Sequence, residues 1–275
     1  GQRRWAEAAL RVINEAFPGG SDDVRTWNVC APLLPHAHAV TSSAENWQLA
    51  SESTGRLVNQ MGMYFLGRAQ YAEAKEAFER SLRLAEAAFG HDHDHPRVAI
   101  NVNNLGEVMR ILGDLAGARQ CYERALRLTE AASDDSKLAV YVNNLGEVLR
   151  NLGDLAGARQ CFERALRLDE AEFGTDHPEV ATDVNNLGLV LNDFGDLASA
   201  RQCFERALKI FEMHLGGDHP NVATLVNNLG FLLKDLGDLA GARQCYERAL
   251  NIFTARLGAE HPKTVITRKN LELLG

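Results

Sequence analysis

A phrase that recurs at a short period constrains the fold of this chain more than any other feature. The letters N-N-L-G begin at positions 103, 143, 185 and 227, and the letters G-D-L-A begin at positions 113, 153, 195 and 237. Successive N-N-L-G copies are 40, 42 and 42 residues apart. A unit of this length cannot bury its apolar face alone and is stabilised by stacking on its neighbours. The sequence therefore predicts a solenoid of stacked repeats.

Each repeat reads as two amphipathic helices joined by a tight turn. In the last full copy, apolar residues at helical spacing predict a first helix carrying Val222, Leu225, Val226, Leu229, Leu233 and Leu236. The pair Gly237-Asp238 interrupts that pattern, and a second apolar stripe then runs from Leu239 to Phe253. Gly258 tolerates a left-handed helix cap and Pro262 prevents continuation of the second helix. The predicted fold class is an all-α solenoid of antiparallel helix pairs.

The repeats define three segments. Residues 1–55 do not repeat and are predicted to form a helical segment. Its first helix is amphipathic, with an apolar stripe of Trp5, Ala9, Val12, Ile13, Ala16 and Phe17, and a second helix, capped by Asp22, carries Trp27 and Cys30. Residues 56–262 form the array of about five helix pairs, which a degenerate copy at Asn59 opens. Residues 263–275 are predicted to be a capping helix at the carboxyl end.

Glycine occupies one place inside the first helix of every full copy. These glycines are Gly106, Gly146, Gly188 and Gly230. Glycine inside a helix costs about 1 kcal/mol relative to alanine. Its presence at this place in each copy predicts a close crossing with the second helix, where the aromatic residue of that helix fills the space.

These residues carry a resemblance. The order L-G, a following aliphatic residue, and then alanine, an aromatic residue and alanine in the second helix resembles the tetratricopeptide repeat. The extension to F-G-T-D-H-P from Phe173 and L-G-G-D-H-P from Leu215 is similar to the longer repeat of kinesin light chains. The resemblance implies a right-handed superhelix with the first helices lining a concave groove. The letters S-D-D-S at 133–136 depart from it, and we expect a local change of superhelical twist there.

A second resemblance concerns the non-repeating segment. The phrase Leu33-Leu34-Pro35-His36-Ala37, with Trp27 before it, resembles the junction after the winged-helix region in bacterial NB-ARC and related STAND ATPases. The chain also begins with Gly rather than Met, which suggests a fragment of a longer protein. The resemblance implies that the chain is the sensor region of a signalling ATPase.

Composition and motifs exclude several classes of function. A net charge of −8 and a pI near 5.6 argue against nonspecific nucleic-acid binding, which leaves a basic footprint. No stretch of about 18 apolar residues predicts a membrane span, so we expect a cytoplasmic protein. The sequence holds no phosphate-binding loop and no nucleophile elbow. We therefore predict a protein that is not an enzyme and has no cofactor.

One stretch has side chains that suit a metal ion, namely His91-Asp92-His93-Asp94-His95. Other repeats carry Asp176-His177, Asp218-His219 and Glu260-His261 at the same place. We therefore interpret the stretch as a loop between repeats, in which an acidic residue caps the next helix and histidine packs nearby. Zinc or nickel binding is the alternative.

Four of the five cysteines also occupy a repeat position: Cys121, Cys161, Cys203 and Cys245. Equivalent helices in a stack lie roughly 8 to 10 Å apart, beyond the reach of a disulfide. We expect them to be reduced and to lie on a buried helix face.

The candidate binding site is the face of each first helix opposite its apolar stripe. An asparagine amide both donates and accepts hydrogen bonds, so a ladder of them can pair with an extended peptide backbone. The alternative is that the second asparagine of each pair satisfies groups on a neighbouring helix. Charged residues dominate this face in the early repeats and apolar residues dominate it in the later ones. The predicted groove residues are Asn103, Asn104, Glu107, Arg110, Asn143, Asn144, Glu147, Arg150, Asn185, Asn186, Leu189, Asn192, Asn227, Asn228, Phe231 and Lys234.

Two functions are consistent with this sequence. The leading hypothesis is a scaffold that binds a protein or peptide ligand in the groove and acts as the sensor of a STAND ATPase. The alternative is a structural module that associates with another copy of itself, because solenoid ends need polar caps and this chain ends with Leu271, Leu273 and Leu274.

Overall fold

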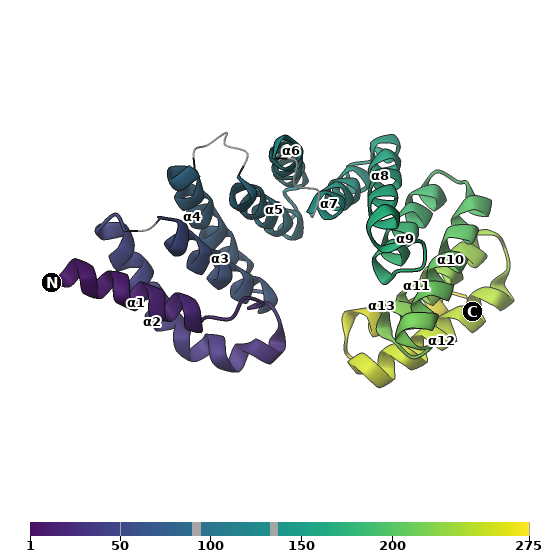
Figure 1. Ribbon diagram of the computed structural model, residues 1–275. Helices are drawn as coiled ribbons and strands as arrows, with labels where there is room; N and C mark the ends of the chain where they lie inside the picture. The colour runs from purple at the N-terminus through teal and green to yellow at the C-terminus, as the bar shows by residue number, and fades with distance from the viewer. Residues whose placement is uncertain (50, 90–94, 133–136, 275) are drawn as a thin grey trace. The chain divides into compact units, whose positions relative to one another are not determined.

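Helices make up the regular structure of this chain. The computed structural model describes residues 1–49, 51–89, 95–132 and 137–274, and no strand occurs in those ranges (Figure 1). The elements are α1 (Gln2–Ala16), η1 (Val24–Thr26), α2 (Trp27–Asn46), α3 (Ser51–Gly67), α4 (Tyr71–Phe89), α5 (Pro96–Ile111), α6 (Leu115–Ala131), α7 (Leu138–Asn151), α8 (Leu155–Phe173), α9 (Pro178–Asp193), α10 (Leu197–Leu215), α11 (Pro220–Asp235), α12 (Leu239–Leu257) and α13 (Pro262–Glu272). The predicted all-α solenoid of helix pairs is confirmed. The division into segments 1–55, 56–262 and 263–275 stays a prediction.

The chain forms two compact units. Unit one is Gly1–Val148 and unit two is Leu149–Gly275. Unit one holds α1 to α6 and most of α7, and unit two holds the last residues of α7 and helices α8 to α13. The letters S-D-D-S at 133–136, where a change of twist was expected, lie outside the described residues.

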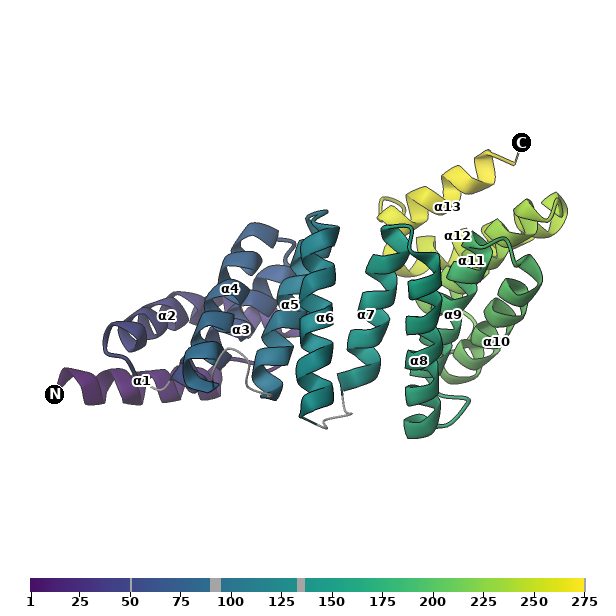
Figure 2. The ribbon, with the colours of Figure 1, turned by 90° about the horizontal axis from the view of Figure 1, so that it is seen from above.

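In unit one the helices α3 and α4, and then α5 and α6, pack as adjacent hairpins (Figure 2). The two amino-terminal helices pack on each other, and both contact α3. Leu10 and Phe17 of the amino-terminal segment and Cys30 of α2 share one apolar core with Phe78 of α4. The non-repeating helices therefore extend the stack.

Two details of the amino-terminal segment differ from the sequence prediction. On the amphipathic helix α1 the exposed fractions are 78% for Trp5 and 58% for Val12, because the helix turns Leu10 toward the core instead. The expected cap at Asp22 is wrong, since Asp23 accepts the capping hydrogen bond from the Arg25 amide at 2.9 Å. That cap starts the short helix η1, and α2 begins after it.

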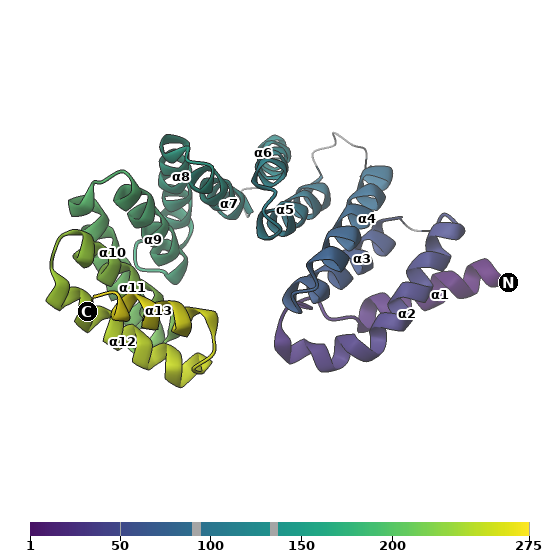
Figure 3. The ribbon, with the colours of Figure 1, turned by 180° about the vertical axis from the view of Figure 1, so that it is seen from behind.

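Unit two repeats the hairpin arrangement with α9 and α10, and with α11 and α12, followed by α13 (Figure 3). Its core is made by side chains that recur at the repeat period. Phe204 and Phe211 of α10 pack with Val222 and Leu225 of α11 and with Phe253 of α12. This contiguous core fixes the relative positions of the helices within unit two.

The letters G-D at the end of each first helix have separate roles. Gly195 and Gly237 adopt φ angles of +82°, a region that favours glycine. The next residue caps the second helix, since Asp196 accepts from the Ser199 amide at 3.2 Å and Asp238 accepts from the Gly241 amide at 2.9 Å. One dipeptide therefore ends one helix and starts the next.

Histidine caps the first helix of several repeats. The Nδ1 atoms of His95, His177, His219 and His261 each accept from the amide two residues later, at 3.1 to 3.3 Å. The expectation that the acidic neighbour would cap these helices is therefore wrong. The unprotonated imidazole nitrogen takes that role, and a proline follows it at the first helical position. Residues 91–94 of the candidate metal stretch lie outside the described residues.

The glycines inside the first helices mark close crossings, as predicted. A Cβ atom on Gly188 would lie 2.8 Å from Cε1 of Phe204, and one on Gly230 would lie 3.0 Å from the Tyr246 ring. At Gly106 the same atom would lie 3.0 Å from Cβ of Cys121 and from Cε1 of Tyr122. Real Cβ atoms essentially never approach within 3.0 Å of such atoms, so Phe204 would have to move if Gly188 were replaced. At Gly106 and Gly230 the neighbouring side chains would have to shift by a few tenths of an ångström.

Candidate interaction face

The first helices of the repeats, called A helices below, are α3, α5, α7, α9, α11 and α13. The second ones, called B helices, are α4, α6, α8, α10 and α12. The A face is the surface of the A helices on the side away from the B helices. It carries the predicted groove residues, and each unit has its own part of it.

The asparagines of the A face bond to one another from repeat to repeat. In unit one, Asn104 donates to Asn59 Oδ1 at 3.0 Å, and Asn144 donates to Asn103 Oδ1 at 2.9 Å. In unit two, Asn228 donates to Asn185 Oδ1 at 2.9 Å. In these three cases the second asparagine of one repeat donates to the first asparagine position of the repeat before it.

The ladder shows how the second asparagine is bonded in three repeats. For Asn104, Asn144 and Asn228 the amide satisfies the neighbouring A helix, which was the alternative interpretation of the sequence. Asn186 is buried, with 8% of its surface exposed.

The first asparagines are half-buried and already hydrogen-bonded. Asn185 Nδ2 donates to Asn186 Oδ1 at 3.1 Å, and Asn103 Nδ2 lies 3.4 Å from Asn104 Oδ1. Asn227 Oδ1 accepts from the Thr267 hydroxyl at 3.2 Å. Asn143 is half-buried as well and interacts with another group. The bond between Thr267 and Asn227 joins α13 to α11, whereas the other two bonds each lie within one repeat.

A charged network occupies the A face of unit one. Arg110 donates to both carboxylate oxygens of Glu107, at 2.7 and 2.9 Å, and lies 3.8 Å from Glu147. The Tyr122 hydroxyl of the B helix α6 donates to the same Glu107 carboxylate at 3.0 Å. The sequence predicted Glu107 and Arg110 as groove residues but did not foresee the tyrosine beneath them.

The network shifts the protonation equilibria of its members. Burial tends to raise the pKa of Glu107, but the hydrogen bonds and charge of Arg110 and the Tyr122 hydroxyl outweigh it and hold that pKa below its usual value. The hydrogen bond to Glu107 raises the pKa of Arg110. Glu107 and Arg110 are therefore both charged near neutral pH and neutralise each other.

The A face of unit two is less charged. Arg150 donates to the Asp193 carboxylate at 2.5 Å. Leu189 is partly buried against the core, and Phe231 is 45% exposed with the Lys234 ammonium 5.8 Å from its ring centre. Asn192 is half-buried, and its Oδ1 has no hydrogen-bond partner among the described residues. The exposed Phe231 ring is the main apolar feature of this surface.

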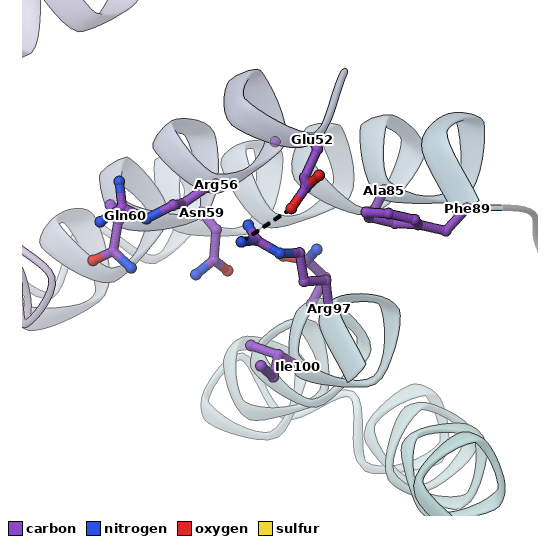
Figure 4. A pocket seen from close by; sticks show the side chains of 10 residues that line it. Glu52, Arg56, Asn59, Gln60, Ala85, Phe89, Arg97 and Ile100 are labelled. Atoms are coloured by element: carbon purple, nitrogen blue, oxygen red, sulfur yellow. Dashed lines mark ion pairs between the residues drawn. The ribbon is translucent and has the colours of Figure 1, made fainter. Parts of the chain in front are cut away.

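A cavity opens between neighbouring A helices in each unit. In unit one it measures about 290 Å³ and is lined by Glu52, Gly55, Arg56, Asn59, Gln60, Ala85, Phe89, Arg97, Ile100 and Asn101 (Figure 4). In unit two a cavity of about 220 Å³ is lined by Thr182, Asn185, Phe211, Asn221, Thr224, Leu225 and Lys263.

The two cavities occupy the same place in the repeat. Asn59 and Asn185 are the first asparagine position of their repeats, and Arg56 and Thr182 both lie three residues earlier. Neither cavity was predicted from the sequence, although the residues that line them stand at fixed offsets from the asparagines. No recurring residue type marks the cavities in the sequence, because the lining positions hold different residues in different repeats. Figure 4 shows Glu52 of α3 and Arg97 of α5 approaching each other across the first cavity, and their charged groups lie 3.2 Å apart.

Other candidate chemistry is sparse in the described part of the chain. No group of three or more potential metal ligands gathers there. The five cysteines are free thiols, and burial raises the pKa of each repeated one. None of the described helices combines the length and apolar composition that a membrane span requires.

Three solved structures have a fold similar to that of this chain. BtubC (BKLC) from P. vanneervenii has a TM-score of 0.64 and 22% identity, with 95% of this chain and 94% of that chain covered. A kinesin light chain of Podosopora anserina with nearly identical TPR-like repeats has a TM-score of 0.62 and 15% identity, with 74% and 95% covered. A Rap protein complexed with Competence and Sporulation Factor has a TM-score of 0.64 and 15% identity, with 88% and 69% covered.

Sequence comparisons identify the family. A search of curated protein sequences finds no significant match. The tetratricopeptide repeat model matches residues 53–131, 136–213, 182–238 and 221–274, which together span nearly all of the chain after its amino-terminal helices. The predicted resemblance to this family is thereby confirmed, and the chain belongs to the tetratricopeptide repeat family.

Proposed function

We propose that this chain is an interaction scaffold that binds a protein or peptide ligand on its A face. One observation carries the proposal. Repeats that share the same framework differ in the side chain four residues after the first asparagine, which is Glu107 in one repeat, Leu189 in another and Phe231 in a third. Since the framework residues are kept and the surface residues vary, the A face has the variation that ligand selectivity requires.

The asparagine ladder supports this role indirectly. Its amides are engaged with each other, so they hold the A helices in register and are not free to clasp a ligand backbone. We assign ligand contact to their neighbours instead. In unit two these are Phe231 and Lys234, and in unit one they are Arg110 and the cavity beside Arg97.

A structure of similar fold supports the choice of ligand class. The Rap protein named above was solved in complex with Competence and Sporulation Factor, so an array of this fold is compatible with a bound partner. The cavities of the A face offer places for ligand side chains, and the exposed Phe231 ring offers an apolar contact.

The test begins with selection of ligands. Peptides are selected from a displayed library on the wild-type chain, and their dissociation constants are then measured by fluorescence anisotropy. For peptides that bind unit two, Phe231→Ala should weaken binding by tenfold or more, since loss of a central aromatic contact costs about 2 kcal/mol.

Met213→Ser is the matched control. Met213 lies on the B helix α10 and is 60% exposed, so it is also an apolar surface residue of unit two. If both substitutions weakened peptide binding equally, or if neither weakened it, the result would argue against ligand binding on the A face.

We also propose that the array is the ligand-sensing region of a STAND-type signalling ATPase. The support is the phrase from Leu33 to Ala37, which lies in α2 and is preceded by Trp27. A gene that encodes a phosphate-binding loop upstream of these residues would be expected. If the rate of ATP hydrolysis by the longer protein did not change with any of the selected peptides, the result would contradict the sensing role.

Self-association is the second candidate function, and the surface of α13 favours it. Val265 and Ile266 are 42% and 57% exposed, whereas Ala181 and Ala223, which occupy the place of Val265 in α9 and α11, are fully buried. Sedimentation of the wild type and of Val265→Ser with Ile266→Ser decides the matter. A wild type that stays monomeric at high concentration would remove this candidate.

A further inference from the structure

Two buried carboxyl groups meet where α8 packs against α9 in unit two. This interface, between the B helix of one repeat and the A helix of the next, is called a joint below. Asp169 of α8 is 8% exposed and Asp183 of α9 is 3% exposed. The two side chains interact with each other at hydrogen-bonding range, and the buried Asp183 Oδ2 has no hydrogen-bond donor among the described residues. Neither residue was among the candidate functional residues of the sequence.

Acidic residues are not a general feature of the repeat at the positions of Asp169 and Asp183. At the next joint of unit two the equivalent residues are Phe211 and Leu225, both buried in the apolar core. At a joint of unit one the residue equivalent to Asp183 is Asn101, whose Oδ1 lies 2.8 Å from the Ser81 hydroxyl. The carboxyl pair is therefore a local departure from joints that are apolar or neutral.

The chemistry of the pair requires a proton. An ionised carboxylate only accepts hydrogen bonds, so two carboxyl groups in hydrogen-bond contact must hold a proton on one of them. Ionisation of both carboxyl groups is unfavourable, because it would place two negative charges close together in a buried site. Burial, followed by the charge and hydrogen bond of Asp169, raises the pKa of Asp183 to about 8.

The charged groups around the pair make the second ionisation still less favourable. Glu170 and Glu172 of α8 and Glu179 of α9 add negative charge, and His177 at the start of α9 opposes them. From α10, Arg206 approaches, but it is held by Glu170 at 2.6 Å and by the Thr175 carbonyl at 3.1 Å.

We propose that Asp169 and Asp183 form a proton-dependent joint, which is closed while the two carboxyl groups share a proton and opens when both are ionised. The inference is independent of any ligand and goes beyond the proposed function. It has a consequence for that function, because α9 carries Asn185 and Leu189 on the A face of unit two. Opening of the joint would change how α9 is presented.

The sign of the pH effect follows from the raised pKa of Asp183. In the unfolded chain an aspartate loses its proton near pH 4, so the folded joint binds the extra proton between about pH 4 and 8. Its stabilising effect is complete below the unfolded pKa and is lost as the pH rises through the folded one. Alkaline conditions should therefore open this joint selectively.

Hydrogen exchange of the full chain tests the proposal. The wild type is compared with the double substitution Asp169→Phe and Asp183→Leu, which copies the next joint, from pH 5 to 9 after correction for intrinsic exchange rates. The opening constant of α9 amides in the wild type, relative to the double variant, should rise by up to about tenfold per pH unit until about pH 8. Peptides from α11 and α12 should not show this difference.

Asp183→Asn is the second variant, because it keeps a neutral donor for Asp169 in nearly the same shape. Its α9 amides should lose the pH dependence, and it decides the question if the double variant does not fold. Wild-type and variant profiles that run parallel across this range would overturn the proposal.

Discussion

Tyr122 and Glu107 are joined across one helix hairpin, with the tyrosine hydroxyl donating to the glutamate carboxylate at 3.0 Å. The equivalent hairpin of unit two combines Tyr246 with Phe231, which offers no acceptor. The Tyr246 hydroxyl is buried with no hydrogen-bond partner among the described residues, and burial raises its pKa to about 12. The same residue type is thus satisfied in one repeat and unsatisfied in another.

Substitution of the two tyrosines by phenylalanine should affect stability differently. Tyr122→Phe removes a hydrogen bond to a charged group and should lower the free energy of unfolding by about 1 to 2 kcal/mol. Tyr246→Phe removes a buried hydroxyl without a partner and should leave that free energy unchanged or raise it slightly. Urea unfolding of both variants measures the difference.

The natural control is already in the chain, since Phe162 and Phe204 occupy the same position in other repeats and show that the ring fits without a hydroxyl. If Tyr246→Phe destabilised the chain as much as Tyr122→Phe, the assignment of Glu107 as the partner that matters would be wrong.

Gly230→Leu should destabilise unit two. Its Cβ would meet the Tyr246 ring at 3.0 Å and Cys245 Cβ at 3.1 Å, and overpacking of this kind costs about 1 to 3 kcal/mol. Thermal unfolding measures the effect. Gly217→Ala is the control, since its Cβ would meet only an Arg248 nitrogen at 3.6 Å. A Gly230→Leu variant as stable as the control would show that this crossing has room.

The repeat made the helix hairpins predictable from the sequence. Gly188 and Phe204 stand at fixed places in a pattern that recurs, so the crossing between their helices could be inferred before any coordinates were known. The same repetition located the A face, because helical spacing decides which side chains share a face.

Hydrogen-bond partners could not be predicted in the same way. Asn104 and Asn228 were candidate ligand contacts in the sequence, but whether an amide meets a ligand or the neighbouring helix depends on the distance between helices, which periodicity does not give. The cap formed by His219 was missed for a related reason. Its acidic neighbour is the more usual cap, and only the backbone geometry shows which side chain reaches the amide.

The histidine caps lead to a prediction about His219. His219 Nδ1 accepts from the Asn221 amide at 3.1 Å at the start of α11. His219→Ala should lower the free energy of unfolding by about 1 kcal/mol, whereas His219→Asn should keep most of it because asparagine is a good capping residue. Chemical unfolding of the two variants at neutral pH measures this. Equal losses in both would mean that the imidazole acts by packing.

The asparagine ladder makes the last prediction, at Asn228. Asn228→Ala removes the donor to Asn185 Oδ1 and should cost about 1 kcal/mol of unfolding free energy. Asn228→Asp should cost more, because it sets a charged acceptor against an acceptor in a half-buried place. Hydrogen exchange of α9 and α11 should report faster opening in the order wild type, alanine, aspartate. If instead aspartate were tolerated as well as alanine while ligand affinity fell, Asn228 would be a ligand contact, and the ladder would not be what holds α9 and α11 in register.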